Sequence, residues 1–576
     1  MPGFYISNLG ENINNKINNV YNNQCIYEAI DGVDNYIVKR NTLNKFLDDK
    51  LFVETEKYII IIEGVILNKQ ELSGDFSWEK SVENMIDQEE FSYFDRFRGS
   101  FSGAHYNKTE HRWVFYTDHT ESKAVFYYCD NDRLVVASNL NYITDTLNSL
   151  SIAYNFNEDY AYCMLTYGYM VSDITPIQEV KKLSYGKYLV FQNGNMYLRS
   201  YYEFNNHSQK YNDYTDEQLI DIWDELFRKA IELEYEKDKE YGYISYTSLS
   251  GGVDSRMNTW VAKDMGYDKL LNVCFTQSDY YDEIIAKKVS QKLGTELFVK
   301  SLNGGMFLSE FRSVVEMSYG MTLYSGIAHS NSVDKYLNFG ILGLIHTGQL
   351  GGVNSPSPKN HILEGAYSQK LADRVKNEFK KPNDIDFESF RVKNREFRGN
   401  IGSQIALTNY TECISPFQYK DFFDFYYALP FEKRKNDYLY FKWICLKYPE
   451  AAKIPVERLY NGYLNDGKLV RRIRLVKMYG IKTTFMWFLW KMGLIKDIDR
   501  KLMSNHMNPY DKWFIENTEL KNKMDSYYNE QIKRLYSTDI ISSALCEDIS
   551  TLYEEGTVGE KTQVITVLST IELFWF

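Results

Sequence analysis

The stretch that decides the fold is "TSLSGGVDSRMN", which runs from Thr247 to Asn258. The segment Tyr241–Leu249, "YGYISYTSL", is rich in aromatic, β-branched and hydroxyl residues and is predicted to form a strand. The segment Arg256–Gly266, "RMNTWVAKDMG", has the apolar spacing of a helix and ends at a glycine. A loop of small residues therefore joins a strand to the beginning of a helix.

This loop has the composition of an anion-binding site. Backbone N–H groups point outward at a helix N-terminus, and the helix dipole favours negative charge there. Ser250 and Ser255 add hydroxyl donors, and Gly251 and Gly252 let a ligand approach the backbone. Asp254 suits a phosphate site if a cation such as magnesium lies between them. A surface turn is the alternative, but the flanking strand and helix argue against it, and the Gly-Lys-Ser of a Walker loop is missing.

Strand and helix patterns alternate downstream of the loop. Leu270–Thr276 is predicted to be a strand, Asp282–Gly294 a helix that ends at glycine, and Gly340–Gly348 a strand that enters a loop. Such alternation predicts an α/β fold with a doubly wound parallel sheet and helices on both faces. Ligands of these folds bind at the carboxyl ends of the strands, where Ser250 and Thr347 should emerge.

The first 200 residues are instead rich in β-strand patterns. A hairpin is predicted in Lys187–Leu198, where Asn193 and Gly194 supply a tight turn. Four short apolar runs between polar turns are also predicted to be strands. These runs are Tyr58–Leu67, Arg112–Asp118, Ala124–Cys129 and Arg133–Ser138.

A polar break separates the two regions. Asn205–Asp213 contains few apolar residues, and a helix is predicted to follow it, with Thr215 and Gln218 able to form a capping box. We therefore expect one domain over residues 1–205 and another over residues 206–576.

Composition narrows the class of protein. A chain of 576 residues is long enough for two or more domains, and 44% hydrophobic with 25% charged residues is typical of a globular protein. The net charge of −12 argues against nucleic-acid binding. The seven cysteines show no zinc or redox spacing, and with no signal-peptide pattern and no apolar run of about 20 residues we expect a cytoplasmic protein.

The segment 468–501 departs from this acidic average. It holds ten basic residues against Asp497 and Asp499, and it includes the aromatic run "FMWFLW" at Phe485–Trp490. A basic stretch with clustered aromatics can lie on an anionic membrane surface. Because buried aromatics are commoner, the sequence favours a helical lid or a subunit contact, such as that of a homodimer, over peripheral membrane contact.

The order of these motifs resembles the asparagine synthetase family, which includes the β-lactam synthetases and the macrolactam cyclases of lasso peptides. Phe97–Tyr128 is similar to that family's N-terminal domain, and "LSGGVDS", "HTGQLGG" and Glu412–Phe425 follow its synthetase domain in order. The resemblance implies an N-terminal αββα sandwich of glutamine-hydrolase type. It also implies a C-terminal domain that binds adenine nucleotide.

The beginning of the chain departs from this resemblance. Family members that use glutamine begin Met-Cys-Gly, and the freed cysteine is the nucleophile, whereas Pro2 stands here and has no thiol. Cys25 lacks the terminal amine as a base, and the glutamine-binding Asn-Gly-Glu loop is replaced by Glu63-Gly64-Val65. Asp118 stands where the family has an aspartate. We therefore expect a first domain without glutaminase activity.

For the synthetase site, the resemblance implies a metal ligand and two catalytic side chains. Asp254 would bind Mg²⁺, Glu412 matches the glutamate that handles the attacking amine, and Lys442 matches a family lysine. A helix-surface glutamate and an exposed structural lysine are the alternatives. Arg458 and Lys468 lie near the family's phosphate-binding lysine. Binding of ATP and pyrophosphate would involve Leu249, Ser250, Gly251, Gly252, Asp254, Ser255, Val273, Thr347 and Gly348.

The resemblance thus implies an ATP-dependent amide ligase that forms an acyl-adenylate and releases AMP and pyrophosphate. Its partners would be a small-molecule or peptide carboxylate, an amine or ammonia, and either a second copy of the chain or a biosynthetic partner protein. The alternative is a nucleotide-binding pseudoenzyme, which Gly352 favours because the family's second magnesium aspartate falls there. A third interpretation, a pyrophosphate-loop enzyme acting on transfer RNA, is disfavoured by the acidic charge.

Overall fold

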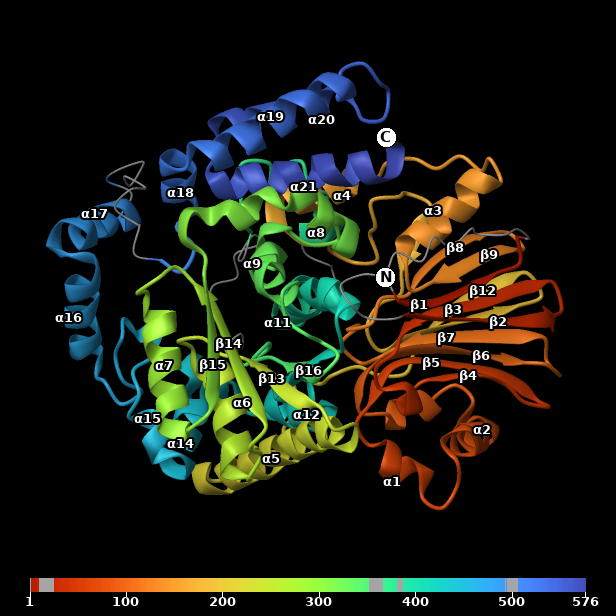
Figure 1. The fold of residues 1–576 in the computed structure, drawn as a ribbon, viewed down its shortest axis with the longest axis horizontal. Coiled ribbons are helices and arrows are strands. Elements are labelled where there is room, and N and C mark those ends of the chain that lie inside the picture. The colour runs from red at the N-terminus through yellow and green to blue at the C-terminus, as the bar shows by residue number, and fades with distance from the viewer. Residues whose placement is uncertain (1, 10–24, 352–365, 381–386, 493, 495–505) are drawn as a thin grey trace.

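The computed structural model describes residues 2–9, 25–351, 366–380, 387–492, 494 and 506–576. Gly352 and residues 495–501 of the basic segment lie outside these ranges. Figure 1 shows a stack of antiparallel sheets built from the N-terminal half. Beside this stack lies a separate sheet of the C-terminal half, which is surrounded by helices.

The N-terminal half contains two six-stranded antiparallel sheets. The first has the order β10-β8-β9-β1-β3-β2 and the second the order β12-β11-β7-β6-β5-β4. Their strands are β1 (Gly3–Ser7), β2 (Cys25–Val33), β3 (Tyr36–Leu43), β4 (Leu51–Glu54), β5 (Tyr58–Ile66), β6 (Gly99–Asn107), β7 (Arg112–Thr117), β8 (Phe126–Asp130), β9 (Arg133–Ala137), β10 (Val180–Lys182), β11 (Lys187–Gln192) and β12 (Asn195–Ser200).

The two sheets pack face to face, with helices on their outer faces. Side chains alternate across a strand, so Ile61 of β5 faces the core between the sheets, whereas Ile60 faces α2 (Trp78–Glu89). The outer face of the first sheet packs against α3 (Leu140–Ser149). These layers form the expected αββα sandwich.

The strands predicted in this half are confirmed. The four apolar runs coincide with β5, β7, β8 and β9. The hairpin of β11 and β12 turns at Asn193 and Gly194, whose φ angles of 51° and 73° are both left-handed. A two-residue type I′ turn requires this conformation, which asparagine and glycine adopt most readily.

The C-terminal half is built on a five-stranded parallel sheet. Its order is β15-β14-β13-β16-β17, and each neighbouring pair is parallel, as predicted. The sequential strands diverge in both directions from β13, which is the doubly wound arrangement. The strands are β13 (Ile244–Ser248), β14 (Leu270–Thr276), β15 (Glu296–Ser301), β16 (Leu342–His346) and β17 (Cys413–Ile414).

Helices cover both faces of this sheet. Cys274 of β14 packs with the helices of one face and Val273 with those of the other. The first face carries α5 (Asp216–Glu240), α6 (Val253–Asp264), α7 (Tyr281–Leu293), α12 (Lys420–Ala428) and α14 (Tyr438–Lys447). The second carries α8 (Phe311–Ser318), α9 (Ser325–Asp334), α18 (Tyr510–Glu516), α19 (Thr518–Leu535), α20 (Ser543–Glu555) and α21 (Val558–Trp575), with α4 (Glu158–Tyr167) from the N-terminal half.

Shorter and peripheral helices complete the described chain. They are α1 (Lys69–Ser73), α10 (Asn377–Lys380), α11 (Phe387–Arg391), α13 (Phe431–Arg434), α15 (Pro449–Ala452), α16 (Lys468–Tyr479) and α17 (Ile481–Lys491). Within the described ranges, no helix has the length and hydropathy needed to cross a membrane.

Helix α5 begins at the capping box that the sequence indicates. The backbone N–H of Gln218 donates to Thr215 Oγ1 over 3.3 Å, and that of Thr215 donates to Gln218 Oε1 over 2.9 Å. Two backbone N–H groups at the start of the helix, which have no acceptor within the helix, thereby gain a hydrogen bond. The domain boundaries at 205 and 206 stay a prediction.

Buried polar contacts join the two halves. Lys45, between β3 and β4, donates from Nζ to the Phe339 carbonyl over 2.7 Å. Asp49 is fully buried and accepts hydrogen bonds of 3.0 Å from both Lys237 Nζ and the Tyr241 hydroxyl. Because unpaired buried charges are costly, these contacts fix how the sandwich and the parallel sheet pack together.

Candidate functional site

The loop between β13 and α6 closes on itself through its serines. Ser255 Oγ lies 3.1 Å from Ser250 Oγ and accepts a hydrogen bond of 3.1 Å from the Ser250 backbone N–H. The Gly252 N–H donates to Ser250 Oγ over 3.2 Å, and Gly252 is the N-cap of α6. The positive end of the α6 dipole therefore points at a loop lined with hydroxyls, as the sequence predicts.

Gly251 lies against two acidic residues. Its N–H donates to Asp282 Oδ1 over 2.6 Å, and a Cβ at this position would lie 2.9 Å from both Asp282 Oδ1 and Glu457 Cβ. Burial raises the pKa of Asp282 to about 6, the Gly251 N–H opposes this rise, and the Glu457 carboxylate adds to it. The loop has no room for a larger residue here.

A second glycine loop folds over Asp254. It follows β16, and a Cβ at Gly348 would lie 2.6 Å from the Ser255 backbone nitrogen. A Cβ at Gly351 would lie 2.5 Å from Asp254 Cγ. Asn258 of α6 holds the loop by donating to the Thr347 carbonyl over 3.0 Å. The structure thus brings the two loops together at the carboxyl ends of neighbouring strands.

A buried charge network supports the base of this second loop. His346 is fully buried, with Nδ1 3.0 Å from Glu234 Oε2 and Nε2 2.7 Å from Asp238 Oδ2. Burial alone would lower the pKa of His346, but the carboxylates of Asp238 and Glu234 raise it to about 9. The Tyr235 ring stacks on the imidazole at 4.1 Å. An imidazolium clamped by α5 therefore fixes the strand that leads into Thr347.

A cavity of about 280 Å³ lies between the two loops. This volume is at the small end of the range for ligand pockets, about 300–1,000 Å³. The opposite wall combines Ile327, Leu407 and Phe275 with the polar side chains of His329 and Gln404. The sequence-predicted residues that line it are Leu249, Ser250, Gly252, Asp254, Ser255, Val273, Thr347 and Gly348.

His329 of α9 is a wall residue that sequence reasoning missed. Burial lowers its pKa to about 4, against the opposing effect of a hydrogen bond from Nδ1 to the Ser325 carbonyl. The imidazole is therefore neutral near pH 7, and its edge contacts the Phe275 ring. No motif surrounds His329 in the sequence, so only its place on the helix above the sheet reveals it.

Arg458 provides a cation next to Asp254. It donates from Nη2 to Asp437 Oδ2 over 3.0 Å. Burial raises the pKa of Asp437 to about 6; Arg458 opposes this rise and the Asp254 charge adds to it. Arg458 and Asp437 thus lie within electrostatic reach of Asp254. Sequence reasoning named Arg458 as a candidate phosphate ligand but missed Asp437.

Glu412 and Lys442 lie outside the cavity. The Glu412 carbonyl accepts from the Ile345 N–H at mid-strand, and its buried carboxylate lies 2.5 Å from Lys123 Nζ and 3.8 Å from Lys50 Nζ. Lys442 Nζ binds Asp216 Oδ2 at 2.7 Å on the outer side of α14. The cavity lies beyond the carboxyl ends of the strands, so the structure does not bring either side chain to it. Their catalytic roles stay predictions.

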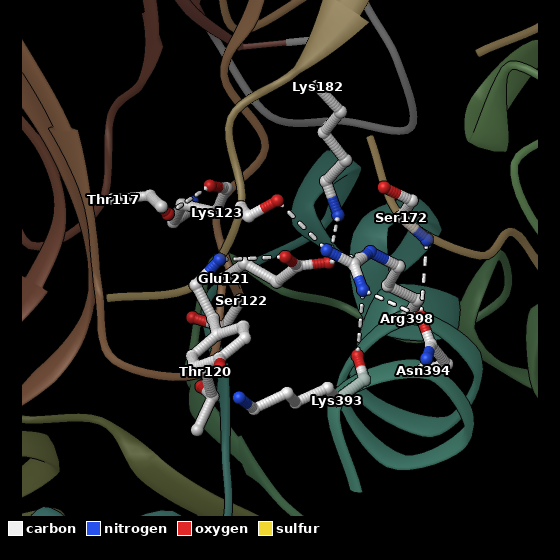
Figure 2. Close-up of polar contacts among 12 residues, drawn as sticks. Thr117, Thr120, Glu121, Ser122, Lys123, Ser172, Lys182, Lys393, Asn394 and Arg398 are labelled. Carbon is white, nitrogen blue, oxygen red and sulfur yellow. Dashed lines mark hydrogen bonds and ion pairs between the residues drawn. The ribbon is translucent and has the colours of Figure 1, made fainter. Parts of the chain in front are cut away.

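A larger cavity, of about 1120 Å³, opens between the two halves. Arg398 lines this cavity and belongs to the buried polar cluster drawn in Figure 2, where Glu121 Oε1 lies 3.1 Å from Lys182 Nζ and 3.3 Å from Arg398 Nε. Arg398 also donates to Asn394 Oδ1 over 2.8 Å and to Ser184 Oγ over 2.9 Å. These contacts tie the sandwich to the helical layer.

One helical segment lines both cavities. The π-helix Val392–Ile401 contributes Arg398 to the larger cavity, and the 3₁₀ segment Gly402–Asn409 that continues it contributes Gln404 and Leu407 to the smaller one. π-Helical turns are rare and often occur at functional sites. A ligand in one cavity would therefore contact the same segment as a ligand in the other.

Comparison with known proteins identifies part of the first half. Residues 48–145 match a glutamine amidotransferase domain. None of the curated proteins compared with this chain matches it.

Two solved structures show a likeness at 9% identity. One is the glutamine phosphoribosylpyrophosphate amidotransferase of B. subtilis complexed with ADP and GMP, matched over 46% of this chain and 77% of its own, with a TM-score of 0.19. The other, an allosteric regulatory enzyme of purine biosynthesis, is matched over 52% and 74%, with a TM-score of 0.20. At these TM-scores neither likeness carries an argument about function.

Two carboxylates of this amidotransferase domain bind other side chains of the protein. Glu63 accepts a hydrogen bond of 2.8 Å from Thr42 Oγ1 and lies 3.4 Å from Arg40 Nη1. Asp118 accepts hydrogen bonds from Thr120 and Ser122 and so holds its own turn. These carboxylates are engaged within the protein.

The thiol nearest the N-terminus is also poorly suited to attack. Cys25 lies half-buried on β2, and burial raises the pKa of its thiol. A raised pKa leaves less thiolate, which is the nucleophilic form.

Proposed function

We propose that this protein is an ATP-dependent amide ligase of the asparagine synthetase type. It would join a carboxylate to an amine or ammonia through an acyl-adenylate, releasing AMP and pyrophosphate. The observation that carries the proposal is the pairing of the Ser250–Ser255 loop at the N-terminus of α6 with the Thr347–Gly351 loop, on one cavity. We also propose, as part of the same hypothesis, that the C-terminal half of this chain is related to the synthetase domain of that family.

The loop residues would bind the phosphates. The hydroxyls of Ser250 and Ser255 and the N-terminus of α6 supply donors, and Arg458 supplies a positive charge. Such groups stabilise the charge that develops on pyrophosphate as it leaves. The substrate carboxylate would attack the α-phosphorus of ATP, and the bond from that phosphorus to pyrophosphate would break as the acyl-adenylate forms.

The residues present fit a magnesium ion held jointly with ATP. Asp254 lines the cavity and would hold the ion, and Asp437 supplies a second carboxylate whose charge acts on Asp254. Among the described residues no group of three His, Cys, Asp or Glu side chains could hold a metal alone. Mg²⁺ commonly takes one or two carboxylates together with substrate phosphates. Bound there, it would neutralise phosphate charge.

The amine would not come from glutamine hydrolysed by this chain. Pro2 lacks a nucleophile, and Glu63 is held by Arg40 and Thr42. The acceptor is therefore free ammonia, an amine on the substrate itself, or an amine supplied by a partner protein.

A nucleotide-binding protein without turnover is the second candidate. The placement of Glu412 in a buried pair with Lys123, away from the cavity, favours it. The "SGGVDS" loop favours the ligase, because its residues Ser250, Gly252, Asp254 and Ser255 all line the cavity.

An exchange experiment separates the two candidates. The ligase should transfer labelled pyrophosphate into ATP in the presence of magnesium and a suitable carboxylic acid, tested as pools of amino acids, peptides and sugar acids. Asp254→Ala should abolish the exchange, whereas Asp264→Ala, at the far end of α6, should not. Magnesium-dependent ATP binding without exchange in any pool would favour the pseudoenzyme.

A further inference from the structure

Helices α16 and α17 lie at the edge of the molecule (Figure 1), and their exposed side chains include large apolar ones. Ile481, Phe485, Phe488 and Met492 recur at intervals of four, three and four residues, which places them on one side of a helix. Each is 50–80% exposed, whereas Thr483 on the other side of α17 is buried. The aromatic cluster that the sequence predicts to be buried is therefore exposed at Phe485 and Phe488.

The preceding helix also exposes large apolar side chains. Leu469 and Ile473 of α16 lie one turn apart and are 71% and 60% exposed. Gly480, with φ at 79°, makes the turn between α16 and α17. Monomeric proteins rarely expose so many large apolar side chains together unless the surface binds something.

The same hairpin is strongly basic. From residue 468 to residue 491 the chain contains seven Lys and Arg residues and no Asp or Glu, in a protein of net charge −12. The side chains of Arg472, Lys477 and Lys482 are exposed around the apolar face. A local concentration of positive charge beside apolar side chains matches an anionic interface.

We propose that α16 and α17 dock this protein on the surface of a membrane that contains anionic lipids. The apolar face would enter the headgroup region while Arg472, Lys477 and Lys482 contact lipid phosphates. With 11 residues, α17 is shorter than the roughly 20 needed to span a bilayer, so it lies on the surface. A symmetric contact between two copies would oppose the same basic residues, and like charges at an interface disfavour pairing.

The segments that precede and follow the docking surface in the sequence each contain a residue of the candidate site or one that contacts it. Before α16, the Glu457 N–H donates to the Gly251 carbonyl over 3.1 Å in the anion loop. After α17, Met507 lines the cavity of the two glycine loops. Docking would therefore hold the site beside the bilayer, although the proposal does not depend on catalysis.

Flotation of the full-length protein with lipid vesicles tests the apolar part of the proposal. Vesicles of phosphatidylglycerol and phosphatidylcholine should retain the protein, and vesicles of phosphatidylcholine alone should not. Combined Ile481→Ser, Phe485→Ser and Phe488→Ser should reduce the bound fraction about tenfold or more. The control is Phe76→Ser with Tyr336→Ser, two exposed rings elsewhere, and it should bind like the wild type.

A charge variant tests the electrostatic part without touching an apolar side chain. Combined Arg472→Glu, Lys477→Glu and Lys482→Glu should also reduce the bound fraction about tenfold or more, since each basic residue contributes roughly fivefold. A control variant with the same change in charge should bind the vesicles like the wild type. It combines Lys239→Glu, Lys287→Glu and Lys453→Glu, all on exposed side chains.

Salt and sedimentation complete the test. Binding should fall between about 0.1 M and about 1 M salt, as the screening length drops from about 10 Å to about 3 Å. The proposal is overturned if the wild type binds vesicles with and without phosphatidylglycerol equally well. It is also overturned if the serine variant and the charge variant each bind vesicles as well as their controls do. It is also overturned if sedimentation reveals a dimer that the serine variant dissociates, because a second copy would then cover the face. Circular dichroism confirms that each variant is folded.

Discussion

At the scale of single residues, the close contact between Gly348 and Ser255 allows a direct test of the candidate site. A methyl group at Gly348 would lie 2.6 Å from a backbone nitrogen, so one of the two loops must move. We expect Gly348→Ala to weaken magnesium–ATP binding about tenfold or more and to cost about 1–3 kcal/mol of unfolding free energy. Calorimetry and urea unfolding measure the two effects.

Gly326 supplies the matched control, because it lines the same cavity and a methyl group there would meet no atom within 4 Å. Gly326→Ala should bind nucleotide like the wild type. Equal losses in both variants would contradict a loop contact specific to Gly348.

A second residue-scale prediction concerns Asp334. Its carboxylate is fully buried and accepts a hydrogen bond of 2.9 Å from the Tyr246 hydroxyl, and burial raises its pKa to about 7. The folded state therefore binds its proton more tightly than the unfolded state does. Between about pH 4 and about pH 7 this group lowers the unfolding free energy by up to about 1.4 kcal/mol for each unit of rising pH.

Asp334→Asn removes that titration while keeping the shape of the side chain. The variant should lose less stability than the wild type between about pH 4 and about pH 7, as followed by thermal unfolding. Parallel pH profiles of the two proteins would show that Asp334 is not protonated in the fold.

At the scale of elements, the contact between the sandwich and the π-helix depends on Glu121. Its side chain is almost fully buried between Lys182 and Arg398. Glu121→Gln would leave two buried cations without their carboxylate, so we expect a loss of about 3–5 kcal/mol in unfolding free energy.

Glu203, which pairs with Lys393 at the larger cavity, is more than half exposed and provides the control. Glu203→Gln should cost less than about 1 kcal/mol because solvent screens an exposed pair. Similar urea midpoints for the two variants would contradict the buried role of Glu121.

The sequence predicts the main helices and strands, and it predicts the loop residues that line one part of the candidate site. Hydroxyls and glycines after β13 and β16 could be placed together because the carboxyl ends of parallel strands share one edge. Asp437 and His329 depend on packing between distant segments, which no local pattern records. Glu412 matched a short motif, but its carbonyl pairs at mid-strand with Ile345, below the cavity. Exposure of Phe485 likewise depends on which neighbours the fold supplies.

At the scale of the whole molecule, the amidotransferase domain is locked to the parallel sheet. Asp49 and Lys45 bury their charged groups in the other half. Because the Cys25 thiol has a raised pKa and Glu63 is engaged by Arg40 and Thr42, we propose that this domain acts as a scaffold. We expect the purified protein to release no glutamate from glutamine, with wild type and Cys25→Ser alike. Glutamate release that Cys25→Ser abolishes would contradict that expectation.

The proposed ligase depends above all on binding of magnesium–ATP by the two glycine loops around Asp254. Calorimetric titration of the wild type, Asp254→Ala and Asp264→Ala with ATP, with and without magnesium, measures that binding directly. We predict magnesium-dependent binding that Asp254→Ala weakens about tenfold or more and that Asp264→Ala retains. Absence of binding by the wild type, or equal affinity in all three proteins, would contradict the proposed site.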